Sequence, residues 1–106
     1  MTGVHATGLE RLDPAIHAPK RLAAMAILAN ASTTDFPFLR DYLQISDSDL
    51  SKQMAALEKA GYVSIHKNGR GPGALTSYRI TREGKRAYKR HVEALRAITD
   101  GAGAAG

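Results

Sequence analysis

Residues 46–61 read SDSDLSKQMAALEKAG and predict a short helix with well-marked ends. Ser46 is a favoured N-cap residue, and Asp49 stands three positions later, which is the form of a capping box. Gly61 is expected to end the helix, because glycine adopts the left-handed conformation of a C′ residue without strain. Between these ends, an apolar stripe recurs at helical spacing and consists of Leu50, Met54 and Leu57.

The helix face opposite this stripe is small, polar and basic. It carries Ser48, Ser51, Lys52, Ala55 and Lys59. Small residues permit close approach to a surface, hydroxyl groups reach bases or phosphates, and lysines neutralise phosphate charge. Such a face suits the major groove of duplex DNA, although an ordinary solvated surface helix accounts for the same residues equally well.

Residues 62–80 predict a two-stranded hairpin. Segments 62–66 and 75–80 alternate in polarity and are rich in β-forming residues. The connecting segment 67–73, KNGRGPG, is too polar and too rich in glycine to belong to a core. Arg70 stands in this tip, where its guanidinium group suits phosphates or a narrow minor groove, while a solvated loop with an incidental charge is the alternative.

A helix with such an open face, joined directly to a basic hairpin, is typical of a winged helix-turn-helix domain on duplex DNA. The flanking sequence agrees, because helical patterns cover residues 19–31, 35–43 and 82–99. Thr33 or Thr34 is expected to cap the second of these helices and Thr81 the third. The predicted fold class is mainly α with a small β-hairpin, a winged helix-turn-helix flanked by N- and C-terminal dimerisation helices.

Length and composition place limits on function. The chain has 106 residues, enough for one modest core, and contains no cysteine, which excludes disulfides, thiol catalysis and zinc–thiolate sites. Neither a signal peptide nor an apolar run long enough for a membrane helix is evident. We therefore expect a cytoplasmic protein without a membrane partner, associated with the nucleoid when bound to DNA. No catalytic, metal-binding or nucleotide-binding motif is present, so neither an enzyme nor a cofactor is expected.

The net charge of +5 is unevenly distributed along the chain. Residues 1–60 hold six Lys/Arg and seven Asp/Glu, a balance of −1, whereas residues 61–106 hold nine and three, a balance of +6. This asymmetry indicates a polyanionic partner on one side of the molecule. It does not distinguish DNA from RNA or from an acidic protein.

The last helix predicts a dimer contact. Tyr88, Val92 and Leu95 form an apolar stripe that has few partners in the compact part of the chain. A helix from a second copy would cover it, while packing against the helix at 19–31 is the alternative. The expected organisation is a flexible arm over 1–11, the DNA-binding domain with its dimerisation helix over 12–99, and a disordered tail over 100–106.

Several loose motifs occur in a specific order across residues 12–98. They are LDPAIHAPKRL (12–22), DFPFLRDYL (35–43), SDSDLSK (46–52), LEKAGYV (57–63) and YRITREGK (78–85). Together they resemble the small bacterial and archaeal winged-helix transcriptional regulators related to the multiple-antibiotic-resistance (MarR-like) family. The resemblance implies a homodimer on a short palindromic operator, with residues 47–60 as the reading helix and the 62–80 hairpin as the wing.

These patterns give two sets of candidate site residues. The candidate DNA contacts are Ser46, Ser48, Ser51, Lys52, Ala55, Lys59, Lys67, Arg70, Ser77 and Arg79. The candidate dimer contacts are Leu12, Ile16, Tyr88, His91, Val92, Leu95 and Ile98.

Two questions stay open at this point. Asp49 departs from the neutral residue found in many members of the family, which leaves the sequence preference undecided. A small-molecule effector would need a pocket at the dimer interface, near His17, Tyr88 and His91. The favoured function is sequence-specific transcriptional regulation, with repression as the default outcome. The alternative is a winged-helix interaction module that binds an acidic protein.

Overall fold

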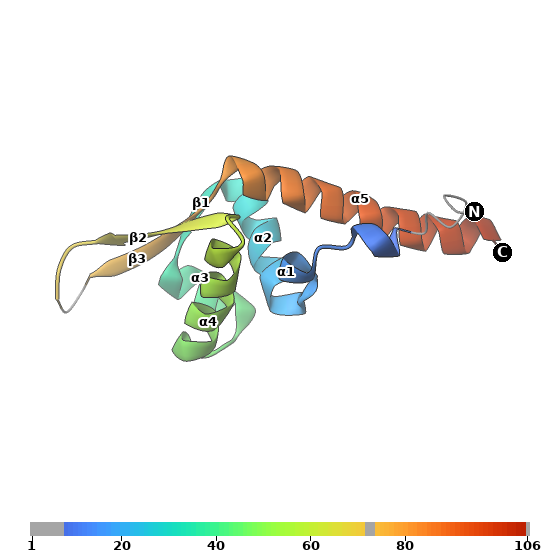
Figure 1. Cartoon of the computed structure of the whole chain (residues 1–106). Helices are drawn as coiled ribbons and strands as arrows, with labels where there is room; N and C mark the ends of the chain where they lie inside the picture. Colours follow the sequence, from blue (N-terminus) through green and yellow to red (C-terminus); the bar gives the residue numbers. More distant parts are fainter. Residues whose placement is uncertain (1–7, 72–73, 106) are drawn as a thin grey trace.

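Helices dominate the structure, and a small sheet projects from one end (Figure 1). The computed structural model describes residues 8–71 and 74–105. The helical segments are η2 (Leu9–Arg11), α1 (Pro14–His17), α2 (Pro19–Ala31), α3 (Phe36–Leu43), α4 (Asp47–Lys59) and α5 (Arg82–Ala105). The strands are β1 (Thr33–Asp35), β2 (Val63–Asn68) and β3 (Leu75–Ile80). This architecture confirms the predicted fold class, a helix-turn-helix followed by a hairpin.

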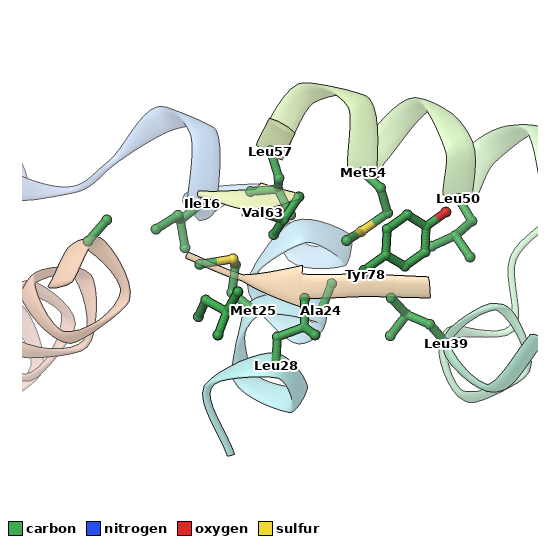
Figure 2. Packing of buried hydrophobic residues seen from close by; sticks show 12 residues of the cluster. Ile16, Ala24, Met25, Leu28, Leu39, Leu50, Met54, Leu57, Val63 and Tyr78 are labelled. Carbon is green, nitrogen blue, oxygen red and sulfur yellow. The ribbon is translucent and has the colours of Figure 1, made fainter. Parts of the chain in front are cut away.

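The hydrophobic core lies where α2, α3 and α4 meet the inner face of the sheet (Figure 2). The predicted α4 stripe is completely buried there, since Leu50, Met54 and Leu57 expose no surface. Met25 and Tyr78 pack into the same cluster from α2 and β3. One face of α4 is thus fixed against the core, and its opposite face must point outward.

Local signals at the helix ends hold as predicted at three positions. Ser46 caps α4, because its Oγ accepts the N–H of Asp49 at 3.1 Å. Gly61 follows the end of α4 with φ +86°, the left-handed conformation that glycine adopts most easily. Thr81 caps α5 through a 2.9 Å hydrogen bond from the N–H of Gly84. These caps set the turns that connect α4, the hairpin and α5.

The sheet has a third strand that the sequence did not predict. Its order is β1-β3-β2, with both neighbouring pairs antiparallel. Thr33 and Thr34 lie in β1 and pair with β3, so neither caps α3, as we had expected. Asp35 takes that role and accepts the N–H of Phe38 at 2.9 Å. Threonine is β-branched and favours a pleated strand, which explains why Thr33 and Thr34 form β1 and do not cap α3.

Both chain ends differ from the prediction. α5 continues through residues 100–105, which we expected to be disordered; alanine is the strongest helix former and carries the helix onward despite the glycines. In the expected N-terminal arm, Leu9–Arg11 forms a short 3-10 helix that packs on α5. Gly8 is buried there, and a side chain at this position would collide with Ala94. Residues 1–7 and 106 lie outside the described parts of the chain.

The resulting molecule is elongated, with extents of 57 × 25 × 21 Å. The β2–β3 hairpin and the C-terminal half of α5 point to opposite ends (Figure 1). α3 and α4 lie below the sheet in that view, and α1 lies between α4 and α5. The fold therefore separates the predicted DNA-reading elements from the predicted dimerisation end of α5.

Candidate nucleic-acid interface

The outward face of α4 presents the small, polar and basic residues that the sequence singled out. Ser48, Ser51, Lys52, Ala55 and Lys59 are all exposed. Ser46 is exposed too, with its Oγ 3.3 Å from that of Ser48. Since the opposite stripe is fixed in the core, this face keeps one orientation relative to the rest of the domain. It combines close approach with hydroxyl donors and two positive charges, as a helix in a major groove requires.

Asp49 does not belong to this face. Its carboxylate accepts a 2.5 Å hydrogen bond from Lys20 of α2 and a 2.9 Å bond from the Gln53 amide. The Gln53 hydrogen bond and then the Lys20 ammonium lower the pKa of Asp49 below its ordinary value. Asp49 is therefore a charged tie between α4 and α2, and it does not reach back to close a capping box. A carboxylate held this way faces away from the open side of α4.

The wing carries its two predicted cations differently. Arg70 lies in the exposed tip, between Gly69 and Gly71 with φ values of +88° and +65°. Lys67 belongs to β2 and pairs with Thr76 of β3, and both line a shallow groove that Ser51 of α4 also lines. Lys67 therefore stands beside the open face of α4. Pro72 and Gly73 of the predicted tip lie outside the described residues.

Two predicted contacts fall on the wrong side of the sheet. Ser77 and Arg79 flank Tyr78 in β3, and Tyr78 is buried in the core. Because successive side chains of a strand point to opposite faces, Ser77 and Arg79 lie on the outer face, away from α4. Alternation with Tyr78 and Ile80 was visible in the sequence and could have assigned this face. These two residues are removed from the candidate interface.

Two other cations lie near α4 and were not among the contacts predicted from the sequence. Lys20 is half-exposed beside Asp49, and Arg40 at the end of α3 pairs with Asp41 at 2.9 Å and Asp47 at 3.0 Å. The hydrogen bonds that Arg40 donates to Asp41 and then to Asp47 raise the pKa of Arg40 above its ordinary value. The Lys20–Asp49 pair is not visible as a sequence pattern, because its two residues are 29 positions apart in the chain. Both cations are ion-paired where α2 and α3 meet α4, so they add no net positive charge to the open face of α4.

The candidate dimer residues divide into two groups. Ile16 and His91 are fully buried within the chain and offer no surface to a partner, which corrects their assignment. His91 is buried because α1 and η2 cover one side of α5, and Ile16 of α1 belongs to the hydrophobic core. The rest stay partly open to solvent, and they are Leu12, Tyr88, Val92, Leu95 and Ile98. Tyr88 and Val92 also line a shallow surface hollow with Ala29 and Asn30 of α2.

A polar junction connects Tyr62, Asp13 and His17 with His91 of α5. The phenol of Tyr62 donates to Asp13 Oδ2 at 2.5 Å, and Asp13 Oδ1 accepts the N–H of Ala15 at 2.9 Å, which caps α1. The backbone N–H of Asp13 donates to His91 Nδ1 at 3.1 Å. Since Nδ1 accepts, the proton of the neutral ring is on Nε2, which lies 3.4 Å from His17 Nδ1.

The same junction shifts two pKa values. The hydrogen bond to Asp13, and then burial, raise the pKa of Tyr62 to about 12, so the phenol stays protonated and donates over the whole neutral range. Burial first, and the neighbouring His17 second, lower the pKa of His91, while Asp13 opposes this change. A protonated Nδ1 would face the Asp13 N–H, so geometry and electrostatics both favour neutral His91.

Other site chemistries find no support among residues 8–71 and 74–105. No cluster of three or more His, Asp or Glu side chains is placed there to hold a metal ion. The His91 tautomer also presents a proton, not a lone pair, toward His17. No helix in the described chain is long and apolar enough to cross a membrane.

Comparison with known proteins confirms the resemblance seen in the sequence. The model of the winged helix DNA-binding domain family matches residues 20–99, which span α2 to α5. The chain belongs to this family. A winged helix of this kind is a DNA-binding transcriptional regulator and not an enzyme.

Three solved structures resemble this winged helix. A transcriptional regulator homologue from Pyrococcus horikoshii is 26% identical with a TM-score of 0.75, over 82% of this chain and 86% of the other. NadR in complex with 4-hydroxyphenylacetate is 24% identical with a TM-score of 0.67, over 89% of this chain and 66% of NadR. Reduced AbfR bound to DNA is 17% identical with a TM-score of 0.59, over 78% of this chain and 58% of AbfR. The likeness to NadR and AbfR, at 24% and 17% identity, shows a shared fold.

Proposed function

We propose that this winged helix is a sequence-specific repressor that binds a palindromic operator as a homodimer, with α4 in the major groove. One observation supports the reading role most strongly. The stripe of Leu50, Met54 and Leu57 is buried, while every candidate contact on the opposite face of α4 is exposed. Lys67 and Arg70 continue this face onto the wing, which would reach the flanking phosphates or minor groove. AbfR, which shares the fold, is solved in a complex with DNA.

The proposed dimer uses the open side of α5. Tyr88, Val92 and Leu95 are apolar and remain partly exposed although α1, η2 and α2 pack against α5. A symmetric pair of α5 helices would bury this stripe in both copies and place the two α4 helices on one side of the duplex. Half-sites about one helical turn apart would then match the two-fold symmetry of the protein.

Repression follows from occupancy, since a dimer that covers its operator blocks access to the promoter beneath it. Such a protein would act on the nucleoid within the cytoplasm. An effector is proposed only as a class, a small molecule seated in the hollow of Ala29, Asn30, Tyr88 and Val92 between α2 and α5. NadR is a structural neighbour that holds 4-hydroxyphenylacetate.

Sedimentation of the protein with and without short duplexes tests the proposal. We expect a dimer at micromolar concentration, two chains on each specific duplex, and affinity that falls steeply with salt because lysines and arginines displace phosphate counterions. A monomer that binds one asymmetric site with full affinity would contradict the dimer. Tight binding to an acidic protein, without affinity for DNA, would instead support a protein-interaction module.

A further inference from the structure

The first residue after α4 and its glycine exit ties three parts of the chain together. The backbone N–H of Tyr62 donates to Leu57 of α4 at 3.0 Å, and its carbonyl accepts the N–H of Thr81, which caps α5, at 3.0 Å. Gly84 of α5 packs against this carbonyl so closely that any side chain there would collide with it. The backbone of Tyr62 therefore fixes where the reading helix ends, where the wing begins and where α5 starts.

The side chain of Tyr62 adds a fourth connection. Its phenol donates to Asp13, which caps α1, and the backbone N–H of Asp13 donates to His91 in the middle of α5. α5 is thus held twice, at its first turn through Tyr62 and Thr81 and further along through Asp13 and His91. Two attachment points along a helix fix its direction, whereas a single point would leave it free to pivot.

We propose that Asp13 is a positioning residue for DNA binding, which holds the reading head of α4 and the wing at a fixed angle to α1 and α5 by accepting the Tyr62 phenol. The inference rests on the proposed dimer, in which α5 carries the two-fold contact and the reading heads must meet two half-sites. In that dimer, the angle between α4 and α5 sets the distance between the two reading helices. Asp13 touches no DNA and acts through Tyr62.

The hydrogen bond is suited to this task. A carboxylate acceptor makes it a charge-assisted bond, and these are stronger than bonds between neutral groups. The phenol keeps its proton because its pKa is about 12. The bond also joins residues 49 positions apart, so it fixes tertiary arrangement and not local helix structure.

Spacing preference distinguishes positioning from stability. The probes are the duplex that the wild-type protein enriches from random DNA, copies with half-site separation changed by one base pair, and a duplex with one half-site. Tyr62→Phe removes only the hydroxyl. We expect about a tenfold loss of affinity for the enriched duplex, the lower end for a hydrogen bond to a charged group. The affinity of the variant for the single half-site should stay within about twofold of the wild-type value. The variant should also lose less affinity than the wild type when the half-site separation is changed by one base pair.

Three further variants complete the experiment. Asp13→Ala should reproduce the effect of Tyr62→Phe, and Asp13→Asn should restore part of the spacing preference, because asparagine still caps α1 and accepts from the phenol. Tyr42→Phe is the matched control, since it removes a phenol hydroxyl from an exposed ring on α3. Equal losses on single and paired half-sites would reduce Asp13 to a stabilising role and overturn the proposal.

Failure of the proposal differs from failure of the proposed function. The positioning role alone would be overturned if the wild-type protein and the Tyr62→Phe variant preferred the same half-site separation to the same degree. A wild-type protein that enriches no paired half-sites would overturn the operator-binding dimer, and the positioning role with it.

Discussion

Replacing Arg70 with alanine should weaken every DNA complex and make its salt dependence shallower. Arg70 lies in the exposed wing tip, beyond the groove that joins Lys67 to α4. Each lost phosphate contact reduces the slope of log K against log salt by about 0.9. A dimer carries two wings, so the slope should fall by about 1.8. Over a fourfold rise in salt, the wild type should therefore lose about twelve times more affinity than the variant.

The assay is fluorescence anisotropy of a labelled duplex at several salt concentrations, with specific and random sequences measured in parallel. Thermal unfolding should hardly change, because a side chain exposed in a loop tip contributes within about 0.5 kcal/mol. Arg79→Ala is the matched control, since it removes the same charge from the outer sheet face and should leave both affinity and slope unchanged. An Arg70→Ala slope equal to the wild type, or an Arg79→Ala effect as large as that of Arg70→Ala, would refute this placement of the wing.

Three more predictions concern α4, α5 and His91. If Lys52 contacts a base, Lys52→Ala should lower the binding free energy by about 1–3 kcal/mol at particular operator positions; if Lys52 contacts a phosphate, affinity should fall evenly across sequences. Ser51→Ala should change the base preference at particular positions. Binding to operators with single base changes distinguishes these cases. Leu95→Glu should give a monomer with unchanged helical circular dichroism, because two carboxylates cannot be buried against each other, and a dimer in sedimentation would contradict the α5 contact. The pKa of His91 is lowered in the folded protein, so below about pH 6.5 the unfolded chain binds a proton at His91 more readily than the folded chain does. The free energy of unfolding should therefore fall as the pH drops below about 6.5. Urea unfolding between neutral and acidic pH measures this effect, and His91→Gln should reduce it.

The elements of the fold were predictable because their signals are local. Ser46, Gly61 and Thr81 mark helix ends through bonds or backbone angles that involve only nearby residues. The apolar stripe of α4 was equally readable, since helical periodicity selects the buried face. The candidate DNA contacts on α4 follow directly from that stripe, so the sequence could identify the exposed face of α4.

What the sequence could not predict depends on residues far apart in the chain. The partner of Asp49 is Lys20, and the partner of Tyr62 is Asp13; each pair forms only when helices from different parts of the chain meet. The burial of His91 required η2 and α1 to pack against α5, although residues 1–11, which include η2, were expected to form a flexible arm. Local patterns therefore predicted the exposed face of α4 well and the packing of the N-terminal segment on α5 poorly.

Selection of bound fragments from random duplex DNA tests most directly that the open face of α4 reads a two-fold operator. The wild-type protein should enrich two inverted half-sites with centres about 10 base pairs apart, one helical turn of the duplex. The Lys52→Ala and Ser51→Ala proteins should lose or alter the enriched bases within each half-site and keep the spacing. Enrichment of a single asymmetric site, or of no sequence at all, would contradict the account.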